Sequence, residues 1–453
     1  MKPLRIKPIH FIPGSFLVAI IIGTLLLMLP FSTAPGADVS ALTAAFTATT
    51  SVCVTGLVVV DTYANWSLFG QLIILILIQI GGLGVVAVGA MVLLVGKKKF
   101  TLTDRKLLEN SLNIEKNRGL LRFLKRIFQG VFIVELTGAV LYSFKLIPLL
   151  GLKNGIWASL FQSVSAFCNA GMDVIGPNSM MDFNDSPYMM CITMALIILG
   201  GLGFVVWFDL IDGIKDGIKN KRSLSRIFTH LPVHSKLVLC LTLFLILSGT
   251  LIVFASEFDN PDTIGNMSIG GKLLNSMFQS VTFRTAGFAS VPQDKLTEVS
   301  CIIGYILMFI GGSPVGTAGG IKTVTVFLVF MNAYSYINGR ENVIFNRRVS
   351  EELMRKAAAV VTYSIVAVFT MTTLLIISDK VTLTDGLYET VSALATVGLS
   401  RSLTPNLTVT GRILIIISMY LGRIGPISMA IFFTKGNGSE HKIRHAEGTF
   451  HVG

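Results

Sequence analysis

Charged residues are scarce in this chain. Of its 453 residues, only 14% are charged and 52% are hydrophobic, whereas about 25% of the residues of a typical soluble domain carry a charge. This shortage argues against a water-soluble fold and indicates a protein embedded in lipid. No glycine-rich dinucleotide fingerprint is present, so any control by nucleotides would have to come from another protein.

Cysteine and histidine are also few, and their placement argues against a zinc site or a disulfide framework. The cysteines show no CxxC spacing and no nearby histidine cluster, and the histidines fall at predicted membrane edges or in tails. A membrane-embedded enzyme is therefore a weak hypothesis, and no covalent or organic cofactor is predicted. The residues concerned are Cys53, Cys168, Cys191, Cys240 and Cys301, and His10, His230, His234, His441, His445 and His451.

Long apolar segments are the main feature of the chain. Six of them approach or exceed the ~20 residues that a membrane-spanning helix needs. Two less apolar segments, 131–150 and 357–377, complete a consistent topology of eight spans. The six clear runs are 11–29, 68–95, 188–207, 237–254, 301–330 and 413–433.

Basic residues are distributed unevenly along a chain whose formal net charge is +12. Most lie in the amino terminus, in the loops after spans two, four and six, and in the carboxyl tail. The positive-inside rule then predicts a multi-pass protein of the plasma (inner) membrane with both termini in the cytoplasm. The densest basic loop, 97–126, also resembles a nucleic-acid-binding segment, but orientation alone requires this bias, so no nucleic-acid partner is predicted.

Four short segments between the spans resemble one another. Each opens with an aromatic residue and closes with a glycine, and the closing glycines lie 115, 116 and 111 residues apart, which is the mark of an internal repeat. A glycine-rich point follows each segment inside the next span, at 81–84, 200–203, 311–314 and 422–426. The segments are 46–56, 161–171, 278–287 and 388–398.

The length of these segments predicts re-entrant hairpins. About 12 helical residues rise ~18 Å, roughly half of a ~30 Å hydrocarbon core. The extended return would leave backbone groups unpaired, which lipid tolerates only where the chain lines an aqueous cavity. The fold class predicted is therefore all-α integral membrane, with four helix, half-helix, helix (M1-P-M2) repeats, in total eight transmembrane helices and four half-helices around one pore.

The predicted boundaries follow from the repeats. They are a cytoplasmic N-terminus (1–10), repeat 1 (11–96), a basic loop (97–127), repeat 2 (128–212), a loop (213–235), repeat 3 with a broken second helix (236–334), a loop (335–356), repeat 4 (357–434) and a cytoplasmic tail (435–453).

The four glycine turns suit a dehydrated monovalent cation. Backbone carbonyls can replace the water of K⁺ without placing a full charge in the pathway, and glycine readily adopts the positive φ that turns a carbonyl inward. A single glycine here would more simply be a helix C-cap; four in register favour a pore. The predicted selectivity filter comprises Val54, Thr55, Gly56, Asn169, Ala170, Gly171, Thr285, Ala286, Gly287, Thr396, Val397 and Gly398, with K⁺ at the carbonyls of Thr55, Gly56, Ala170, Gly171, Ala286, Gly287, Val397 and Gly398.

The run 311–322 is rich in glycine and contains Pro314, so it cannot stay a regular helix. Since the break falls below the predicted filter, the run is a candidate gate; close helix packing through small residues is the alternative. It superficially resembles a phosphate-binding loop but lacks the Gly-Lys pair and a preceding strand. The gate residues predicted are Gly312, Ser313, Gly316, Thr317, Gly319, Gly320, Lys322 and Arg423.

Arginines inside spans are costly and therefore candidates for function. Arg423 is expected near the gate, or simply to hold carbonyls of the broken helix. Arg284, three residues before a filter glycine, is expected to point behind the filter to carbonyls or carboxylates, with Glu135 and Glu389 as candidate counter-charges.

Together these motifs resemble the membrane subunit of Ktr-type transporters in the Trk/Ktr/HKT superfamily of potassium transporters. The matches are 54–57, 169–172, 284–288, 396–399, 312–322 and 422–426. The resemblance implies pseudo-fourfold symmetry, potassium selectivity, an intramembrane gate, a homodimer to which the tail contributes, and a cytosolic ring of nucleotide-binding (RCK-type) subunits. It leaves open whether Na⁺ assists transport. A secondary transporter coupling an ion to an organic solute is the alternative, although such proteins usually show two halves rather than four repeats.

Overall fold

The computed structural model describes residues 8–37, 39–85, 87–90 and 120–425. The predicted cytoplasmic tail, with its expected dimer contact, and most of the basic loop 97–127 therefore lie outside the described residues. The described chain is mostly helical, apart from one short β-hairpin.

The helices follow one another in the order that the apolar pattern predicts. Short helices alternate with longer ones, and 3₁₀ turns η1 to η4 stand in the loops. The elements are α1 (Pro8–Leu27), η1 (Pro30–Ser32), α2 (Ala41–Cys53), α3 (Thr62–Asn65), α4 (Leu68–Leu83), α7 (Leu120–Leu150), α8 (Leu152–Cys168), η2 (Met181–Phe183), α9 (Pro187–Leu202), α10 (Phe204–Lys219), α11 (Leu224–His230), α12 (Val233–Glu257), α13 (Ile269–Phe283), η3 (Gln293–Lys295), α14 (Glu298–Phe309), α15 (Thr323–Ile337), β1 (Val343–Ile344), β2 (Arg347–Arg348), α16 (Glu351–Asp379), α17 (Leu383–Leu394), η4 (Thr404–Asn406) and α18 (Val409–Ile424).

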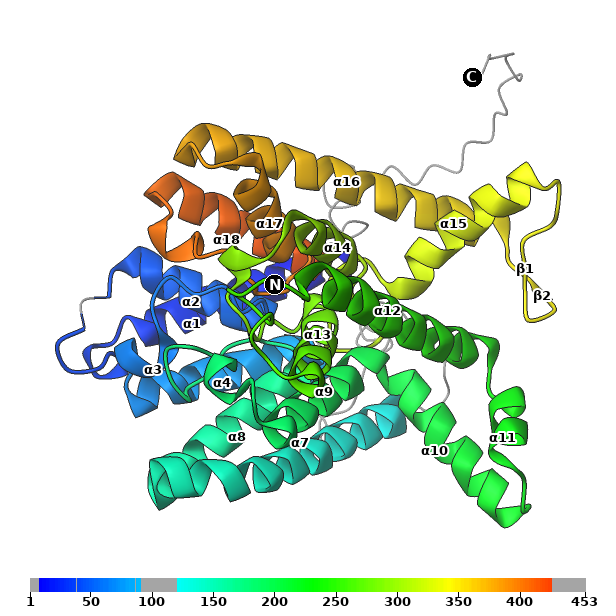
Figure 1. The fold of residues 1–453 in the computed structure, drawn as a ribbon, viewed down its shortest axis with the longest axis horizontal. Helices are drawn as coiled ribbons and strands as arrows, with labels where there is room; N and C mark the ends of the chain where they lie inside the picture. Colours follow the sequence, from blue (N-terminus) through cyan, green and yellow to red (C-terminus); the bar gives the residue numbers. More distant parts are fainter. Residues whose placement is uncertain (1–7, 38, 86, 91–119, 426–453) are drawn as a thin grey trace, which may run out of the picture.

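Among the residues that the structure describes, three helices, α7, α12 and α16, are long and apolar enough to cross a membrane by themselves. They expose large apolar side chains such as Phe132, Phe244 and Phe369, which are 66%, 65% and 64% accessible. A surface of this kind is unfavourable in water and suits lipid. In Figure 1, α16 and α7 lie at opposite sides of the molecule with the short helices between them.

The four short segments fold as buried helices, α2, α8, α13 and α17, as predicted. Hydroxyl side chains begin three of them: Ser40 accepts a hydrogen bond from the amide of Thr43, Ser268 from that of Gly271 and Thr382 from that of Asp385. Most residues of these helices are buried. They therefore form the centre of the molecule.

The packing of these helices closes a cycle. Each contacts the helices that flank it in sequence, and in addition one helix from another quarter of the chain: α8 packs on α4, α13 on α9, α17 on α14, and α2 on α18. Because the last contact joins the end of the chain to its beginning, the four short helices surround a common centre.

The helix after each short helix is interrupted at glycine. Gly84, Gly203 and Gly425 end α4, α9 and α18 with φ of 87°, 93° and 88°. Within the described residues, the apolar runs 68–95 and 188–207 are therefore not single continuous helices, and the run 413–433 is described only as far as Gly425. At Gly203 the chain turns sharply, with α9 and α10 bent by 99°. The predicted break in the third helix is confirmed, because loop 310–322 separates α14 from α15.

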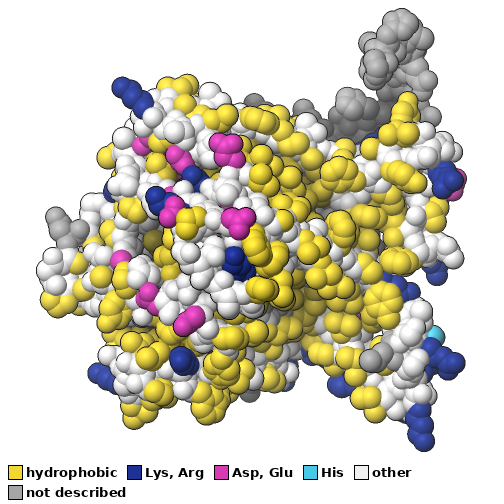
Figure 2. All heavy atoms as spheres, in the orientation of Figure 1, with side chains coloured by type: hydrophobic (Ala, Val, Ile, Leu, Met, Phe, Trp, Pro, Cys, Tyr) yellow, Lys and Arg dark blue, Asp and Glu magenta, His cyan; other side chains and the backbone are white. Residues whose placement is uncertain are grey.

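One side of the molecule carries projecting elements. In Figure 1, α10, α11, α15 and the β1–β2 hairpin extend to the right of the short helices. Figure 2 shows hydrophobic side chains over most of the same face, acidic side chains over its left and centre, and Lys and Arg on the projecting parts at the right.

Candidate functional site

The four predicted filter glycines meet at the centre of the molecule, each touching the next. A Cβ atom placed on Gly56 would lie 2.5 Å from the carbonyl oxygen of Ala170. One placed on Gly171 would lie 2.6 Å from Cα of Gly287, and one on Gly287 would lie 2.5 Å from the carbonyl oxygen of Val397. A Cβ on Gly398 would collide with the carbonyl oxygen of Thr55, which closes the ring.

The glycines have the positive φ that the sequence predicts, between 63° and 99°. Two residues before each glycine stands a second left-handed residue, which the sequence does not predict because side chains disfavour this conformation. These residues are Val54, Asn169, Thr285 and Thr396, with φ of 55°, 60°, 67° and 50°. Left-handed conformations at every second residue turn successive carbonyls to the same side of a strand. Non-glycine residues held this way cluster at functional sites.

Hydrogen bonds behind the ring fix the direction of the first carbonyls. The amides of Thr55, Ala170, Ala286 and Val397 donate to the carbonyl oxygens of Thr50, Ser165, Thr282 and Ser392, over 2.8, 2.8, 3.0 and 2.8 Å. In a trans peptide the N–H and the preceding C=O point in opposite directions. The carbonyls of Val54, Asn169, Thr285 and Thr396 therefore face away from the short helices, toward the ring. These four oxygens are candidate cation ligands that the sequence does not single out.

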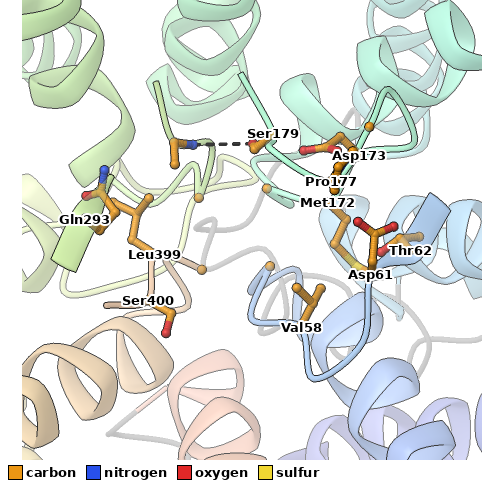
Figure 3. A pocket seen from close by; sticks show the side chains of 16 residues that line it. Val58, Asp61, Thr62, Met172, Asp173, Pro177, Ser179, Gln293, Leu399 and Ser400 are labelled. Atoms are coloured by element: carbon orange, nitrogen blue, oxygen red, sulfur yellow. Dashed lines mark hydrogen bonds between the residues drawn. The ribbon is translucent and has the colours of Figure 1, made fainter. Parts of the chain in front are cut away.

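The ring opens on one side into a cavity of about 140 Å³ lined by all four glycines. Figure 3 shows Asp61 and Asp173 on one side of this cavity, opposite Gln293, Leu399 and Ser400. Burial raises the pKa of Asp173 to about 7; the carboxylates of Asp61 and Asp182 act in the same direction, against a hydrogen bond from Ser179. Both carboxylates of the cavity lie in loops after the repeated segments, where no repeated motif marks them, and neither was predicted.

On the opposite side of the ring lies loop 310–322, which contains seven of the predicted gate residues. Its backbone is bound to the break between α9 and α10: the amide of Ser313 donates to Gly201 over 2.9 Å, that of Thr317 to Gly200 over 3.1 Å, and that of Phe204 to Val315 over 2.9 Å. The Thr317 hydroxyl also donates to the carbonyl of Phe167, at the end of α8, over 3.0 Å. The loop is therefore in direct contact with the underside of the ring.

Small residues allow this contact. Gly312, Gly316 and Gly319 have neighbours so close that a Cβ would overlap them, and Gly320 has a φ of 66°. The neighbour of Gly319 is the hydroxyl of Thr396, a residue of the ring. The Lys322 ammonium donates to the carbonyl of Ala318 over 2.6 Å, inside the same loop.

Arg423, at the end of α18, joins two distant parts of the chain. Its guanidinium donates to the carbonyl of Thr317 over 2.9 Å and to that of Gly81 over 2.5 Å. The second bond was not predicted. Gly81 lies on α4 in the first quarter of the cycle, and loop 310–322 belongs to the third, directly opposite quarter. The loop therefore extends beneath the ring toward α4.

Arg284 does not have the carboxylate partners that we considered. It is buried, and its guanidinium reaches the carbonyl of Gly311 at 3.5 Å. Within residues 120–425 neither candidate counter-charge pairs with it: Glu135 accepts from Gln79, and Glu389 accepts from Ser400 and Thr404. Glu135 lies on α7 and Glu389 on α17, so they stand behind other quarters of the ring than Arg284, which follows α13.

The chain matches known proteins over nearly its whole length. The profile of the TrkH family, described as "Cation transport protein", matches residues 11–443. Ktr system potassium uptake protein B of Bacillus subtilis is 37% identical over 100% of this chain and 98% of its own length. Potassium/sodium uptake protein NtpJ of Enterococcus hirae is 34% identical over 99% of this chain and 98% of its own.

A solved structure shares the fold. The potassium transporter TrkH from Vibrio parahaemolyticus superposes with a TM-score of 0.75, covering 96% of this chain and 86% of the other, at 16% sequence identity. With the apolar helices, the family match identifies a multi-pass membrane protein of a cation transporter family, and the resemblance drawn from the motifs is confirmed.

Proposed function

Because this chain belongs to the TrkH family of cation transport proteins, we propose that it takes up potassium through one axial pore. The closed cycle of α2, α8, α13 and α17 carries this proposal. In it, the chain forms four repeats, each a helix, a re-entrant half-helix and a helix, with pseudo-fourfold symmetry, eight spans and both termini in the cytoplasm of the plasma membrane. The carboxyl ends of the half-helices, which are partially negative, point at the pore and favour a cation.

The filter of this pore consists of the residues at the ring: 54–56, 169–171, 285–287 and 396–398. Its ligands are the inward carbonyls, which now include those of Val54, Asn169, Thr285 and Thr396. The support is their backbone conformation, since the left-handed residues lie at the same two positions in all four segments. Carbonyl dipoles replace the water of K⁺, and the membrane potential drives the ion inward with about 2.3 kcal/mol per charge per 100 mV.

Loop 310–322 is the gate in this proposal. Arg423 supports it, because one guanidinium holds both the loop and Gly81 on the far side. A loop held in this position blocks the axis below the filter, and the positive charges of Arg423 and Lys322 oppose the passage of cations. Opening requires the loop to leave Gly200, Gly201 and Arg423, all of which it contacts through backbone groups.

The proposal also includes a regulatory partner and a second ion. The name of the Bacillus subtilis relative describes a component of a system, which supports a regulatory partner, here a cytosolic ring of nucleotide-binding subunits acting on a homodimer. The basic surface around α11 and the β1–β2 hairpin is suited to contact it. The name of the Enterococcus hirae relative supports sodium as a second ion, either transported or stimulating.

Rubidium uptake tests the function. The chain is expressed in a bacterial strain that lacks its own potassium transporters, and uptake of Rb⁺ is followed with and without excess K⁺. We expect saturable uptake that K⁺ suppresses and that an equal concentration of choline does not. Uptake no greater than in cells carrying an empty vector would count against the proposal.

The outer cavity predicts a dependence on external pH. Because the pKa of Asp173 is raised to about 7, its carboxyl is charged above this pH and neutral below it, and only the charged form attracts a cation. We expect the apparent affinity for Rb⁺ to fall about twofold to fivefold as external pH falls from about 8 to about 6, a modest effect typical of one partly screened charge. Asp173→Asn should show the low affinity at both pH values; a variant that keeps the full pH response would refute the assignment.

A further inference from the structure

A hydroxyl side chain stands at the same place in all four short helices, four residues after the opening aromatic. These residues are Thr50, Ser165, Thr282 and Ser392, and each is fully buried. Their carbonyls already hold the filter backbone, as described above. Their side chains do so a second time, at a position further along each filter segment.

In the first and fourth segments the hydroxyl holds the filter glycine. The amide of Gly56 donates to Oγ1 of Thr50 over 2.9 Å, and the amide of Gly398 donates to Oγ of Ser392 over 3.1 Å. Because a trans peptide places its C=O opposite its N–H, these bonds direct the carbonyls of Thr55 and Val397 into the ring.

In the second and third segments the hydroxyl acts one residue later. The amide of Met172 donates to Oγ of Ser165 over 3.2 Å, which directs the carbonyl of Gly171 into the ring, and Ser165 donates in turn to the carbonyl of Met172. Thr282 donates to the carbonyl of Phe288 over 2.7 Å. That bond turns the Phe288 oxygen away from the axis and so ends the run of inward carbonyls.

The two hydroxyls that flank Thr50 in α2 behave differently. Thr49 and Ser51 donate to the carbonyls of Ala45 and Thr47, four residues earlier in their own helix, which is the usual partner of a helical hydroxyl. In the described structure, Thr50, Ser165, Thr282 and Ser392 do not bond this partner; they bond the backbone of the filter glycine or of the residue directly after it. Their common position and common departure from the local pattern indicate a shared role.

We propose that Thr50, Ser165 and Ser392 are positioning residues that hold the filter peptides in the carbonyl-inward orientation, that Thr282 ends the run of inward carbonyls in its segment, and that the four hydroxyls thereby set the preference for K⁺ over Na⁺. The proposal rests on the potassium pore proposed above. Without the hydroxyl, a filter peptide is free to rotate and present its N–H to the ion. Na⁺, which tolerates a less regular cage, should then compete better, whereas total transport need not fall.

The test compares Rb⁺ and Na⁺ fluxes of the purified full-length protein in proteoliposomes. Thr50→Val removes the hydrogen bond and keeps the shape of the side chain, Thr50→Ser keeps the bond, and Thr49→Val is the matched control, since that hydroxyl bonds only its own helix. In the fourth segment, Ser392→Ala is paired with Ser392→Thr. We expect the Rb⁺/Na⁺ flux ratio to fall about tenfold in Thr50→Val and Ser392→Ala, the loss associated with one buried hydrogen bond, and to stay near wild type in the other three.

The outcomes are distinguishable. A wild-type protein that transports neither Rb⁺ nor Na⁺ contradicts the proposed function itself, and one that transports both equally overturns the positioning role, because there is no preference for the hydroxyls to set. A selective wild type with equally selective Thr50→Val and Ser392→Ala overturns the positioning role alone. If one of these two variants does not fold, the flux ratio of the other decides. An equal loss of the Rb⁺/Na⁺ flux ratio in Thr49→Val would overturn the positioning role, because it would show that buried hydroxyls matter here only for stability.

Discussion

Replacing Gly171 with alanine is expected to lower potassium uptake by roughly a hundredfold or more. A Cβ at this position would lie 2.6 Å from Cα of Gly287 and 2.7 Å from the carbonyl oxygen of Ala286, at a φ of 63°. Left-handed strain costs about 1–2 kcal/mol and overpacking about 1–3 kcal/mol, so the intact ring should become a minor population. Rb⁺ uptake in the transporter-deficient strain measures the loss, with the amount of protein in the membrane determined in parallel.

Gly151 provides the matched control. It also has a positive φ, 78°, but among the described residues no atom lies within 4 Å of the position of its Cβ. Gly151→Ala therefore carries the backbone strain without the collision and should keep most of the uptake. If Gly171→Ala transports K⁺ as well as Gly151→Ala does, the glycine ring is not the path of the ion.

Replacing Arg423 with alanine should have the second largest effect, in the opposite direction. The guanidinium makes two charge-assisted bonds, to Thr317 and Gly81, and such bonds are worth about 1.5–3 kcal/mol each when they are buried. Their loss frees loop 310–322 from α4 and removes a positive charge below the filter. We expect Rb⁺ flux into proteoliposomes containing this protein alone, without a regulatory partner, to rise at least about tenfold.

Arg412 controls for the loss of an arginine from the same helix. Its guanidinium also binds carbonyls, those of Leu407 and Pro405, but at the other end of α18. Arg412→Ala should leave the basal flux unchanged. An unchanged basal flux in Arg423→Ala would contradict a role in closing the pore, and a lower flux would mean that the guanidinium supports the open pore.

The centre of the fold could be predicted from the sequence because it is repeated. The same pattern of an aromatic residue, a short helix and a closing glycine occurs four times, and the four copies support one interpretation. Gly56, Gly171, Gly287 and Gly398 were identified in this way, although any one of them alone resembles an ordinary helix cap. The break at loop 310–322 was predicted for a different reason, since glycine and Pro314 are locally incompatible with a helix.

Features that depend on contacts between repeats could not be predicted in this way. The bend at Gly203 is stabilised by the bond from Phe204 to Val315, which is formed by residues more than a hundred positions apart in the chain. A left-handed conformation is disfavoured at Val54, Asn169, Thr285 and Thr396 because each carries a side chain. In each case the amide of the next residue holds it, through a hydrogen bond to a carbonyl of the short helix. Arg423 was identified because an arginine inside a membrane span is costly. Its bond to Gly81 could not be predicted, because it forms only where the last repeat packs against the first.

The position of a bound ion shows whether the four filter segments form the ion path. The protein is crystallised with Rb⁺ in place of K⁺, and anomalous scattering at the rubidium edge locates the ion. We expect a peak on the axis between the four filter segments, surrounded by the carbonyls of residues such as Thr55, Gly171 and Val397. Rubidium bound elsewhere in a protein that takes it up, with the ring unoccupied, would contradict it.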